Sequence, residues 1–418
     1  MDDQKKLPEL RFSGFEGEWE EYNLGDLFEI TSASRVHKNE WTQSGVPFFR
    51  SSDVVADFKG IENKKAFISF ELYKELSNKS GSVQANDLLV TGGGSIGIPY
   101  LIKSNDPFYF KDADLLWLRN GNKLNGYFLY NFFATTSFRS FINSITHIGT
   151  IAHYTIEQAK STPIIIPHRT EQNKVGEFLL KLDQHLAHRE QMHDKLINLK
   201  KAMLEKMFPK DGDAVPEIRF KEFKKDWKED KLVDLCSLFS DGDWIESKDQ
   251  SSNGIRLLQT GNVGVNEFKD KTDKSKWISE ETMEALNCTE VLPGDILISR
   301  LPDPAGRACI VPNLDEKAIT AVDCTIVRAS DRLVNTFLIQ YLSTNSYFNK
   351  VNNLLAGGTR QRISRSSLGE FIIKVPSNAE QKKIGNYFHN LDRLISKHQD
   401  LVTKLVAIKK ACLEKLFV

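Results

Sequence analysis

Apolar residues recur at alternating steps of four and three along residues 171–208, a stretch that contains no proline. This spacing keeps the apolar side chains on one narrow stripe of an α-helix. About 38 residues at roughly 1.5 Å each make a helix about 57 Å long. The stripe skips six residues once, between its two blocks, which are Val175, Leu179, Leu182, Leu186 and Met192, Leu196, Leu199, Met203. The pattern therefore predicts one long helix with a single apolar seam.

The same seam returns 209 residues later, in residues 380–417, with the same steps and the same skip. Its apolar positions are Ile384, Phe388, Leu391, Ile395, Leu401, Leu405, Ile408 and Cys412. Neither helix can bury a narrow stripe alone, so we expect the two to pack together as an antiparallel coiled coil. The alternative is that each helix packs on its own half of the chain. We expect the packing contacts at Leu179, Leu182, Leu186, Leu196, Leu199, Phe388, Leu391, Ile395, Leu405 and Ile408.

The segment before each helix also repeats, at an offset of 208 or 209 residues. The sequence Pro-Glu-Leu-Arg-Phe at Pro8–Phe12 returns as Pro-Glu-Ile-Arg-Phe at Pro216–Phe220. Short β-branched and aromatic runs follow, broken by Gly, Pro, Asn and Asp, which is typical of strands joined by long loops. Helices are expected at residues 126–141 and 336–349. Such a duplication indicates two copies of one module, and it favours two equivalent binding events on one extended partner.

These patterns predict an α+β fold. Two similar mixed α/β domains are separated by two long antiparallel helices, and a pseudo-twofold internal repeat relates the halves. A length of 418 residues suits two domains of ordinary size. The expected segments are a first domain at residues 1–168, a first spacer helix at 169–208, a linker at 209–222, a second domain at 223–377 and a second spacer helix at 378–418.

Composition describes a globular protein, with 40% hydrophobic and 27% charged residues. The 56 basic residues balance 56 acidic ones, so any contact with nucleic acid must come from local patches. All five cysteines lie in the second half without a Cys-x-x-Cys pair, which favours a reducing cytoplasm over a disulfide or zinc framework. No signal peptide is evident, and no apolar run approaches the roughly 18 residues of a membrane span. We therefore expect a cytoplasmic protein that makes no membrane contact.

One glycine-rich segment, Thr91–Gly97, contains Gly-x-Gly-x-x-Gly directly after a predicted strand. Alone, this pattern suggests a dinucleotide or S-adenosylmethionine site. However, Pro99 and an apolar run follow where a helix should begin, and the corresponding segment of the second copy, Ser299–Arg307, has a different sequence. We therefore favour a flexible loop near the binding face.

Other candidate chemistry is weak. Asn105–Phe108 has only one proline of the Asn/Asp-Pro-Pro-Tyr/Phe sequence of amino-methyltransferases, and a plain turn explains it. His185, His188 and His193 are not spaced as i, i+4 ligands, so we predict no metal site. No Gly-Lys-Ser/Thr phosphate loop, Ser-His-Asp set or carboxylate pair stands out.

Basic and polar loops occupy matched positions late in each module. The segment Gly357–Arg365 carries three arginines and a glutamine, whereas its counterpart Ile148–Tyr154 shares the Gly-Thr but not the arginines. Arginine pairs with guanine, glutamine pairs with adenine, and both hold phosphates. Different side chains at one place are what two modules would carry if each read a different short DNA sequence.

The candidate DNA contacts lie in these loops and at polar positions near them. In the first module they are Arg35, His37, Lys38, Arg50, Thr91, Ser95, Thr150, His153 and Tyr154. In the second they are Trp244, Lys248, Arg300, Arg307, Thr359, Arg360, Gln361, Arg362 and Arg365.

In their order, repeated twice, these features resemble the specificity subunit of type I restriction-modification systems. The match covers almost the whole chain. Its elements are Trp-x-x-x-x-Leu-x-Asp at Trp19–Asp26 and Trp227–Asp234, the strands at Asn86–Leu89 and Gly294–Leu297, the late Gly-Thr, Ile-x-x-Pro at Ile164–Pro167 and Ile373–Pro376, and Glu-Gln leading to Leu182-Asp183 and Leu391-Asp392. Asn86 stands where the second copy has Gly294, which is a departure between the copies.

The resemblance implies two target-recognition domains that each grip half of a bipartite double-stranded DNA site. It implies that the long helices dock two methyltransferase subunits, which bind S-adenosylmethionine and methylate adenine. It also implies that motor-nuclease subunits, which use ATP and Mg²⁺, join for cleavage. On this reading the chain itself is not an enzyme and binds no cofactor. Because the loops of the modules differ, the target should be asymmetric.

Two alternatives belong to other classes. A stand-alone DNA methyltransferase would use the Gly92–Gly97 loop and would bind S-adenosylmethionine without a partner. A two-headed coiled-coil adaptor would bind proteins and no nucleic acid.

Overall fold

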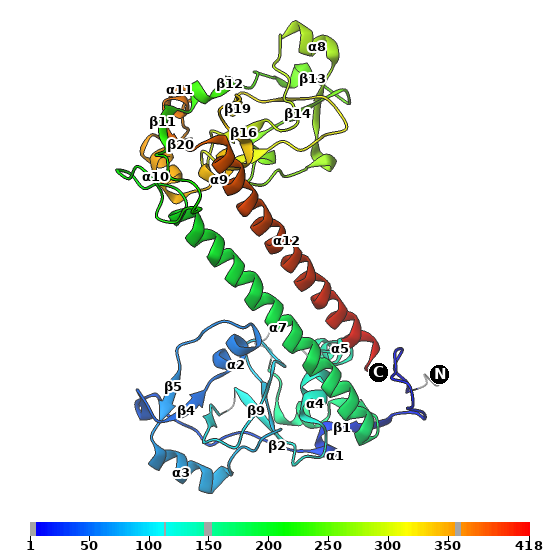
Figure 1. The fold of residues 1–418 in the computed structure, drawn as a ribbon. Coiled ribbons are helices and arrows are strands. Elements are labelled where there is room, and N and C mark those ends of the chain that lie inside the picture. Colours follow the sequence, from blue (N-terminus) through cyan, green and yellow to red (C-terminus); the bar gives the residue numbers. More distant parts are fainter. Residues whose placement is uncertain (1–5, 113, 146–152, 356–360) are drawn as a thin grey trace. The chain divides into compact units, whose positions relative to one another are not determined.

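The computed structural model describes residues 6–112, 114–145, 153–355 and 361–418 (Figure 1). The chain divides into two compact units. Unit 1 comprises Met1–Glu190 and Asp400–Val418, and unit 2 comprises Gln191–Gln399. Below, module 1 denotes residues 15–168 and module 2 denotes residues 223–377. The unit boundaries therefore fall inside the two long helices, whereas the boundaries expected from the sequence followed the modules.

Module 1 is built on three small sheets. Strands β1 (Glu20–Asn23) and β10 (Pro163–Ile166) form an antiparallel pair that joins the start of the module to its end. A four-stranded sheet has the order β2-β9-β6-β7, with β2 at Glu29–Thr31, β9 at Leu115–Arg119, β6 at Leu88–Thr91 and β7 at Pro99–Leu101. A second has the order β3-β5-β4-β8, with β3 at Trp41–Thr42, β5 at Ala66–Ile68, β4 at Val46–Phe49 and β8 at Tyr109–Phe110. Among the described strands of module 1, only β4 and β8 pair in parallel.

Module 2 repeats this topology strand for strand. The pair is β11 (Lys228–Lys231) with β20 (Ile372–Val375). One sheet has the order β12-β19-β16-β17, at Cys236–Asp241, Cys324–Ala329, Ile296–Ser299 and Ala308–Ile310. The other has the order β13-β15-β14-β18, at Gln250–Ser251, Lys276–Ile278, Ile255–Leu258 and Ala318–Thr320, and again only its last pairing is parallel. The internal repeat is thus a repeat of fold as well as of sequence.

Short helices connect the strands. In module 1 they are α1 (Leu24–Leu27), η1 (Lys38–Glu40), α2 (Ser51–Phe58), α3 (Phe70–Ser80), α4 (Gly126–Phe132), α5 (Thr136–Ile145) and α6 (Ile156–Lys160). In module 2 they are η2 (Val233–Leu235), η3 (Ser247–Asp249), η4 (Thr260–Asn262), η5 (Thr272–Lys274), α8 (Glu280–Ala285), α9 (Asn335–Tyr341), α10 (Asn345–Asn353) and α11 (Arg365–Gly369).

The two helices expected at residues 126–141 and 336–349 are each broken in two, so this prediction was wrong. The break lies at Thr135 in module 1 and at Thr344 in module 2. Each threonine hydroxyl accepts a hydrogen bond from a backbone N–H three residues on, that of Phe138 or Tyr347, at 3.2 Å. This is how an N-terminal cap begins a new helix.

The long helices are α7 (Arg169–Lys206) and α12 (Asn378–Lys415). The first turns of α7 bury Val175 and Leu179 in the core of module 1, and those of α12 bury Ile384 and Phe388 in the core of module 2. The N-terminal turns of each long helix therefore pack on the module that precedes that helix in the chain.

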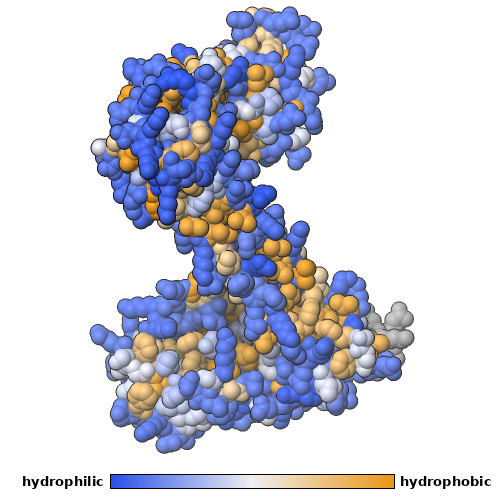
Figure 2. Space-filling model, viewed as in Figure 1, coloured by the Kyte–Doolittle hydropathy of each residue, from blue (hydrophilic) through white to orange (hydrophobic). Residues whose placement is uncertain are grey.

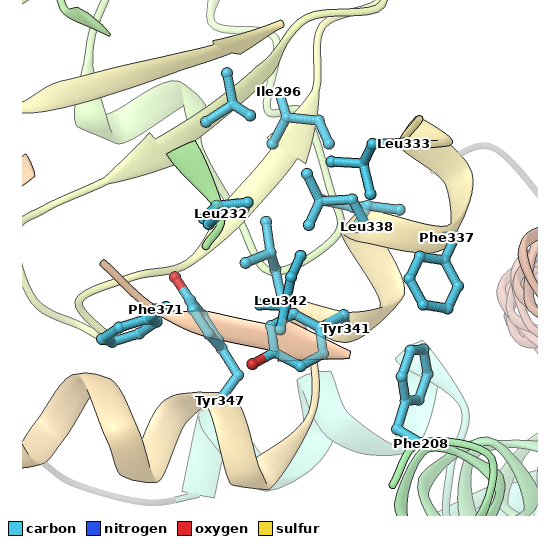
Figure 3. Packing of buried hydrophobic residues seen from close by; sticks show 14 of the residues in the cluster. Phe208, Leu232, Ile296, Leu333, Phe337, Leu338, Tyr341, Leu342, Tyr347 and Phe371 are labelled. Atoms are coloured by element: carbon cyan, nitrogen blue, oxygen red, sulfur yellow. The ribbon is translucent and has the colours of Figure 1, made fainter. Parts of the chain in front are cut away.

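The far end of each helix completes the core of the other module. In unit 2, Leu204, Met207 and Phe208 join the core of module 2, and the ring of Phe208 lies 5.3 Å from that of Phe337 (Figure 3). In unit 1, Cys412, Leu416 and Phe417 join the core of module 1, and the ring of Phe417 lies 4.8 Å from that of Phe128. The core of module 2 is thus completed by residues at the end of α7 and just after it, and the core of module 1 by residues at the end of α12 and just after it.

An ion pair joins the two helices at equivalent places in each unit. In unit 2, Lys200 of α7 pairs with Asp392 of α12, and Phe208 contacts Phe388. Later residues of α7 thus face earlier residues of α12, so the pair is antiparallel. In unit 1, Lys409 of α12 pairs with Asp183 of α7 at 2.6 Å. The predicted α+β fold, with two similar domains and two long helices, is confirmed.

Most of the predicted seam is covered, but two positions are not. Leu179, Phe388 and Leu391 are buried, and Leu182, Leu186, Leu196, Ile395 and Leu405 are half-buried. Leu199 is 43% exposed and its counterpart Ile408 is 48% exposed, so these two assignments were wrong. The packed face passes instead through Lys200 and Lys409, one position further on and therefore about 100° around the helix. Among the described residues, no helix is both long and apolar enough to cross a membrane.

Candidate nucleic-acid interface

The repeated sequence landmarks tie each module to its own long helix. Arg11 of the first Pro-Glu-x-Arg-Phe segment forms a two-pronged ion pair with the buried Glu171, with both contacts at 2.8 Å. Arg219 pairs in the same way with the buried Glu380, at 2.7 and 2.8 Å. Such bidentate pairs fix geometry as well as adding energy. The Glu-Gln and Pro-Glu-x-Arg-Phe sequences therefore position the module and are not part of a reading surface.

The neighbouring glutamines act in the same way. The side chain of Gln172 accepts from the backbone of Asn125 at 3.1 Å and donates to the carbonyl of Pro167 at 2.9 Å. Gln381 accepts from the backbone of Val334 and donates to the carbonyl of Pro376, at 2.8 and 3.0 Å. Asn86 and Gly294, which differ between the copies, both have positive φ, 74° and 92°. Asparagine tolerates this conformation, so the departure is a conservative one.

In module 2, three predicted arginines meet two aspartates along one edge, which we call the basic edge of module 2. Arg300 and Arg365 approach Asp241, with Nε to carboxylate distances of 3.4 and 3.9 Å. Arg362 approaches Asp323 at 3.9 Å. The backbone ties the segments together, because Arg300 N–H donates to the carbonyl of Asp323 at 2.9 Å.

The exposed arginines of this edge are held loosely. The side chains of Arg362 and Arg365 are 61% and 48% exposed, and their contacts with Asp323 and Asp241 are long. Exposed ion pairs of this kind contribute about 0–1 kcal/mol, so a phosphate or a base can replace the carboxylate at little cost. The aspartates orient the guanidinium groups and leave their donors available. An arginine held loosely in this way can bind a guanine base or a phosphate group through two N–H donors at once.

Module 1 has a smaller set of groups at the same place, the basic edge of module 1. His153 and Asp114 correspond to Arg362 and Asp323 at an offset of 209 residues. A Cβ built on Gly93 would lie 3.5 Å from Nδ1 of His153 and 3.6 Å from Oδ1 of Asp114, so both side chains border this glycine. Lys111 pairs with Asp114. A basic group beside an aspartate therefore occurs in both modules, with a different side chain in each.

A loop beside each edge carries further predicted residues. In module 1, Arg35, His37 and Lys38 are exposed around η1. In module 2, Trp244 and Lys248 are exposed around η3, and Lys248 pairs with Glu246 at 3.0 Å. This loop begins three residues after Asp241, so it continues the basic edge of module 2. Ser95 and Gln361 are also exposed.

Five of the predicted contacts are engaged inside the modules. Thr91 and Tyr154 are buried, and the Tyr154 hydroxyl shares a hydrogen bond with Thr162 at 2.6 Å. Arg50 forms a two-pronged pair with Asp53, at 2.7 and 2.9 Å. Arg300 is buried and donates to the carbonyl of Val322. We therefore correct their assignment to one of holding the loops.

Arg307 is the fifth, and it clamps two loops together. Its guanidinium donates to the carbonyl oxygens of Val263 at 2.7 Å, Thr260 at 2.9 Å, Leu301 at 2.7 Å and Pro304 at 3.0 Å. Burial lowers the pKa of this guanidinium below its ordinary value. With its donors directed at the backbone, Arg307 shapes the segment between β16 and β17 and has little left to offer a base.

The glycine-rich segment lies in a hairpin between the antiparallel strands β6 and β7. The hydroxyl of Thr91 accepts from the backbone of Ile98 at 2.9 Å, and Gly92 donates to the carbonyl of Asp114 at 2.9 Å. A dinucleotide loop leads into a helix whose N-terminus receives the pyrophosphate. Here a strand follows, so the segment is not built as such a site.

Thr150, Thr359 and Arg360 lie outside the described residues. Asp114, Asp241 and Asp323 were not predicted from the sequence, because only the fold shows which basic side chain lies near each carboxylate. Among the described residues, no three His, Cys, Asp or Glu side chains are grouped to hold a metal ion.

Comparison with known proteins gives the family. The family model described as the type I restriction modification DNA specificity domain matches residues 16–197 and, a second time, residues 224–405. This chain belongs to that family. The resemblance to the type I specificity family that was stated from the sequence is confirmed.

Individual relatives are distant. A Haemophilus influenzae protein named as a type I restriction enzyme specificity subunit is 29% identical over 165 residues, which is 38% of this chain and 39% of the relative. A Methanocaldococcus jannaschii protein named as the MjaX specificity subunit is 21% identical over 204 residues, 47% of this chain and 46% of that protein. The matches thus span less than half the length of these relatives.

The fold likeness extends over the whole chain. The crystal structure of a type I restriction-modification S subunit from M. genitalium matches with a TM-score of 0.61 and 16% identity. The match covers 99% of this chain and 99% of that one. At this identity the likeness concerns the fold, and it extends over both segments that the family model matches.

Proposed function

We propose that this chain is the DNA-reading subunit of a type I restriction-modification complex in the cytoplasm, and that each module reads one half of an asymmetric bipartite site. The observation that carries the proposal is the pair of basic edges. Topologically identical modules hold His153 beside Asp114 in one case and Arg362 beside Asp323 in the other. A common scaffold with different donors at the same position is suited to reading two different short sequences.

The two donors have different chemistry. The Arg362 guanidinium offers a planar fork of N–H groups, which suits the O6 and N7 acceptors of guanine in the major groove. The His153 imidazole offers one ring N–H and one acceptor in its neutral form. The two half-sites would therefore differ in sequence, and the complete site would not be a palindrome.

The long helices are proposed to hold the two modules at a fixed separation and to dock two methyltransferase subunits. Hydrophobic surface lies along these helices in Figure 2. The exposed apolar side chains of the helices include Leu199 of α7 and Leu394 of α12 in unit 2, and Val406 and Ile408 of α12 in unit 1. Exposed apolar side chains grouped on a helix mark a protein contact. The methyltransferase subunits would bind S-adenosylmethionine, and motor-nuclease subunits with ATP and Mg²⁺ would join for cleavage.

Selection from randomised DNA tests this proposal. The chain, assembled with its methyltransferase subunit, is incubated with duplexes that contain a randomised region, and bound duplexes are sequenced. We expect enrichment of two short, unlike sequences at one fixed spacing, with an affinity that falls steeply as salt rises. Binding without enrichment and without salt dependence would indicate the protein adaptor. S-adenosylmethionine binding by the purified chain alone would indicate the stand-alone methyltransferase.

A further inference from the structure

Trp244 is the most exposed large hydrophobic side chain among the described residues, at 70%. Its indole N–H donates to Glu246 Oε1 at 3.3 Å, within its own loop. The polar edge of the ring is thus satisfied locally, and the apolar faces are left in solvent. A single exposed apolar residue is ordinary, but Trp244 stands on an anchored loop that continues the basic edge of module 2.

The backbone before Trp244 is fixed to the sheets of module 2. Gly242 donates to the carbonyl of Cys324 at 2.9 Å, and Asp243 donates to that of Thr320 at 2.8 Å. A Cβ on Gly242 would lie 2.3 Å from the Thr320 carbonyl oxygen, so this close approach requires glycine. The Asp243 carboxylate also accepts from the backbone of Thr289 at 3.0 Å.

The backbone after Trp244 is fixed as well. Ile245 packs against the apolar cluster of Ile255 and Ile278. Glu246 N–H then donates to Asp249 Oδ2 at 2.8 Å, which caps η3. A large apolar ring held on such an anchored loop loses little conformational freedom when it meets a partner, and this preorganisation favours binding.

Acidic and basic side chains both lie beside Trp244, and the basic ones suit the DNA backbone of the proposed function. Arg365, which is 48% exposed, approaches Asp241 on the preceding side at 3.9 Å, and Lys248 pairs with Glu246 on the following side at 3.0 Å. Both are exposed ion pairs, in which a phosphate can replace the carboxylate at little cost. Cations on both sides would bind phosphates and bring the ring onto the bases between them. Apolar side chains that enter between base steps unstack and kink the duplex, and aromatic rings stack on any base.

The matching position in module 1 is occupied differently. Trp244 corresponds to Arg35, at an offset of 209 residues, on a loop of the same topology that ends in the similarly capped η1. Arg35 is exposed. A charged side chain cannot serve as an apolar wedge. The difference between the modules therefore extends from the bases that they contact to the shape that they impose on DNA.

We infer that Trp244 is a wedge that enters a base step in the half-site read by module 2 and unstacks it, whereas module 1 leaves its half-site undistorted. The inference rests on the proposed function. It adds that part of the specificity of module 2 comes from the deformability of the DNA, so flexible pyrimidine–purine steps should be preferred at the point of insertion.

The test uses the complex of the chain with its methyltransferase subunit and duplexes carrying the selected site. 2-Aminopurine is placed in turn at each position except the adenine that is methylated, because unstacking raises its fluorescence. We expect a severalfold rise at one step of the module 2 half-site with the wild type and with Trp244→Phe. With Trp244→Ala the rise should be lost, and affinity should fall about 10- to 100-fold. Arg35→Ala, the matched control in module 1, should keep the rise.

Each other outcome overturns the inference in a recognisable way. A rise that persists in Trp244→Ala shows that the ring does not unstack the step. Loss of the methyltransferase subunit from the Trp244→Ala complex, measured by mass photometry, makes the ring a protein contact. If the wild type selects no site, the proposed function fails together with the inference. Thermal unfolding of Trp244→Ala at the wild-type temperature confirms that the variant is folded.

Discussion

At the scale of single residues, the structure separates side chains that hold the modules together from side chains that can meet DNA. Composition and spacing could not make this distinction. Arg300 and Arg362 are both arginines in basic loops, yet the first is buried and the second is 61% exposed. The difference arises because Arg300 follows a central strand, whereas Arg362 lies in a loop beside the partly exposed Asp323.

The role of Arg362 can be measured directly. Arg362→Ala should lower the affinity of the complex about 10-fold for duplexes whose module 2 half-site is intact, because a good bidentate contact is worth about 1–3 kcal/mol. Duplexes with a scrambled module 2 half-site should be bound as by the wild type. Arg332→Ala removes another exposed arginine of module 2, which pairs with Asp230, and serves as the control. Equal loss on both kinds of duplex would assign Arg362 to non-specific phosphate binding.

The paired arginines 11 and 219 should matter for stability instead. Arg219→Met leaves the buried Glu380 without its partner, and we expect the free energy of unfolding to fall by about 2–4 kcal/mol, because an uncompensated buried carboxylate is costly. Urea denaturation monitored by tryptophan fluorescence measures this. Lys79→Met removes an exposed pair with Glu75 and should leave the free energy of unfolding nearly unchanged, because water and salt screen such a pair. Equal effects of the two variants would contradict the account.

At the scale of elements, the long helices were the most predictable part of the chain and their partners the least. A stripe with steps of three and four fixes that a helix exists and where it begins and ends, to within two residues here. It does not say that the last turn of α7 enters module 2. The stripe also led to the wrong prediction that Leu199 and Ile408 pack between the helices. The partly buried Lys200 and Lys409 lie there instead and pair with aspartates of the facing helix.

Each long helix ends in the core of one unit, so a substitution at that end should destabilise that unit and leave the other unchanged. Phe417→Ala removes a buried ring that stacks on Phe128 and should destabilise unit 1 by about 3–5 kcal/mol. Hydrogen exchange followed by mass spectrometry should show faster exchange in α4 of module 1 and unchanged exchange in α9 of module 2. The matched variant Phe208→Ala should give the reverse pattern. Faster exchange throughout the chain in both variants would mean that the units do not open separately.

Strand topology was less predictable from the sequence than the long helices and more predictable than the packing partners of these helices. The repeat indicated that whatever fold one module had, the other would share, and the equivalent strand orders agree with this. Which strands pair was not predictable, because short strands separated by long loops leave many registers open. The threonines that break the helices at 135 and 344 could have been read as caps, since threonine is a favoured N-cap residue.

At the scale of the whole molecule, the chain is a duplicated scaffold with diverged surfaces. Buried positions keep their partners in both copies, as Arg11–Glu171 and Arg219–Glu380 do. The exposed positions differ, as do His153 and Arg362, or Arg35 and Trp244. A duplication that preserves the core and changes the edges is what an asymmetric reader requires.

The proposed docking of two methyltransferase subunits can be tested on the helices. Leu199→Lys and Ile408→Lys place charges at equivalent exposed apolar positions and should reduce assembly of the complex at least about 10-fold without changing the fold, because each charge must be desolvated at the contact. Native mass spectrometry measures the subunits retained. Lys201→Glu and Lys410→Glu alter exposed residues about 200° around each helix and should assemble normally. Full assembly of all four variants would exclude this face.

The central claim, that two unlike modules read two unlike half-sites, is tested most directly by mapping methylated adenines. The chain and its methyltransferase subunit are expressed in a host without other adenine methylation, and the host DNA is sequenced by a method that detects the modified base. We expect one split, asymmetric sequence with a fixed gap, in which Arg362→Ala relaxes one half and His153→Ala the other. A palindromic or unsplit sequence, or relaxation of both halves by one substitution, would contradict the account.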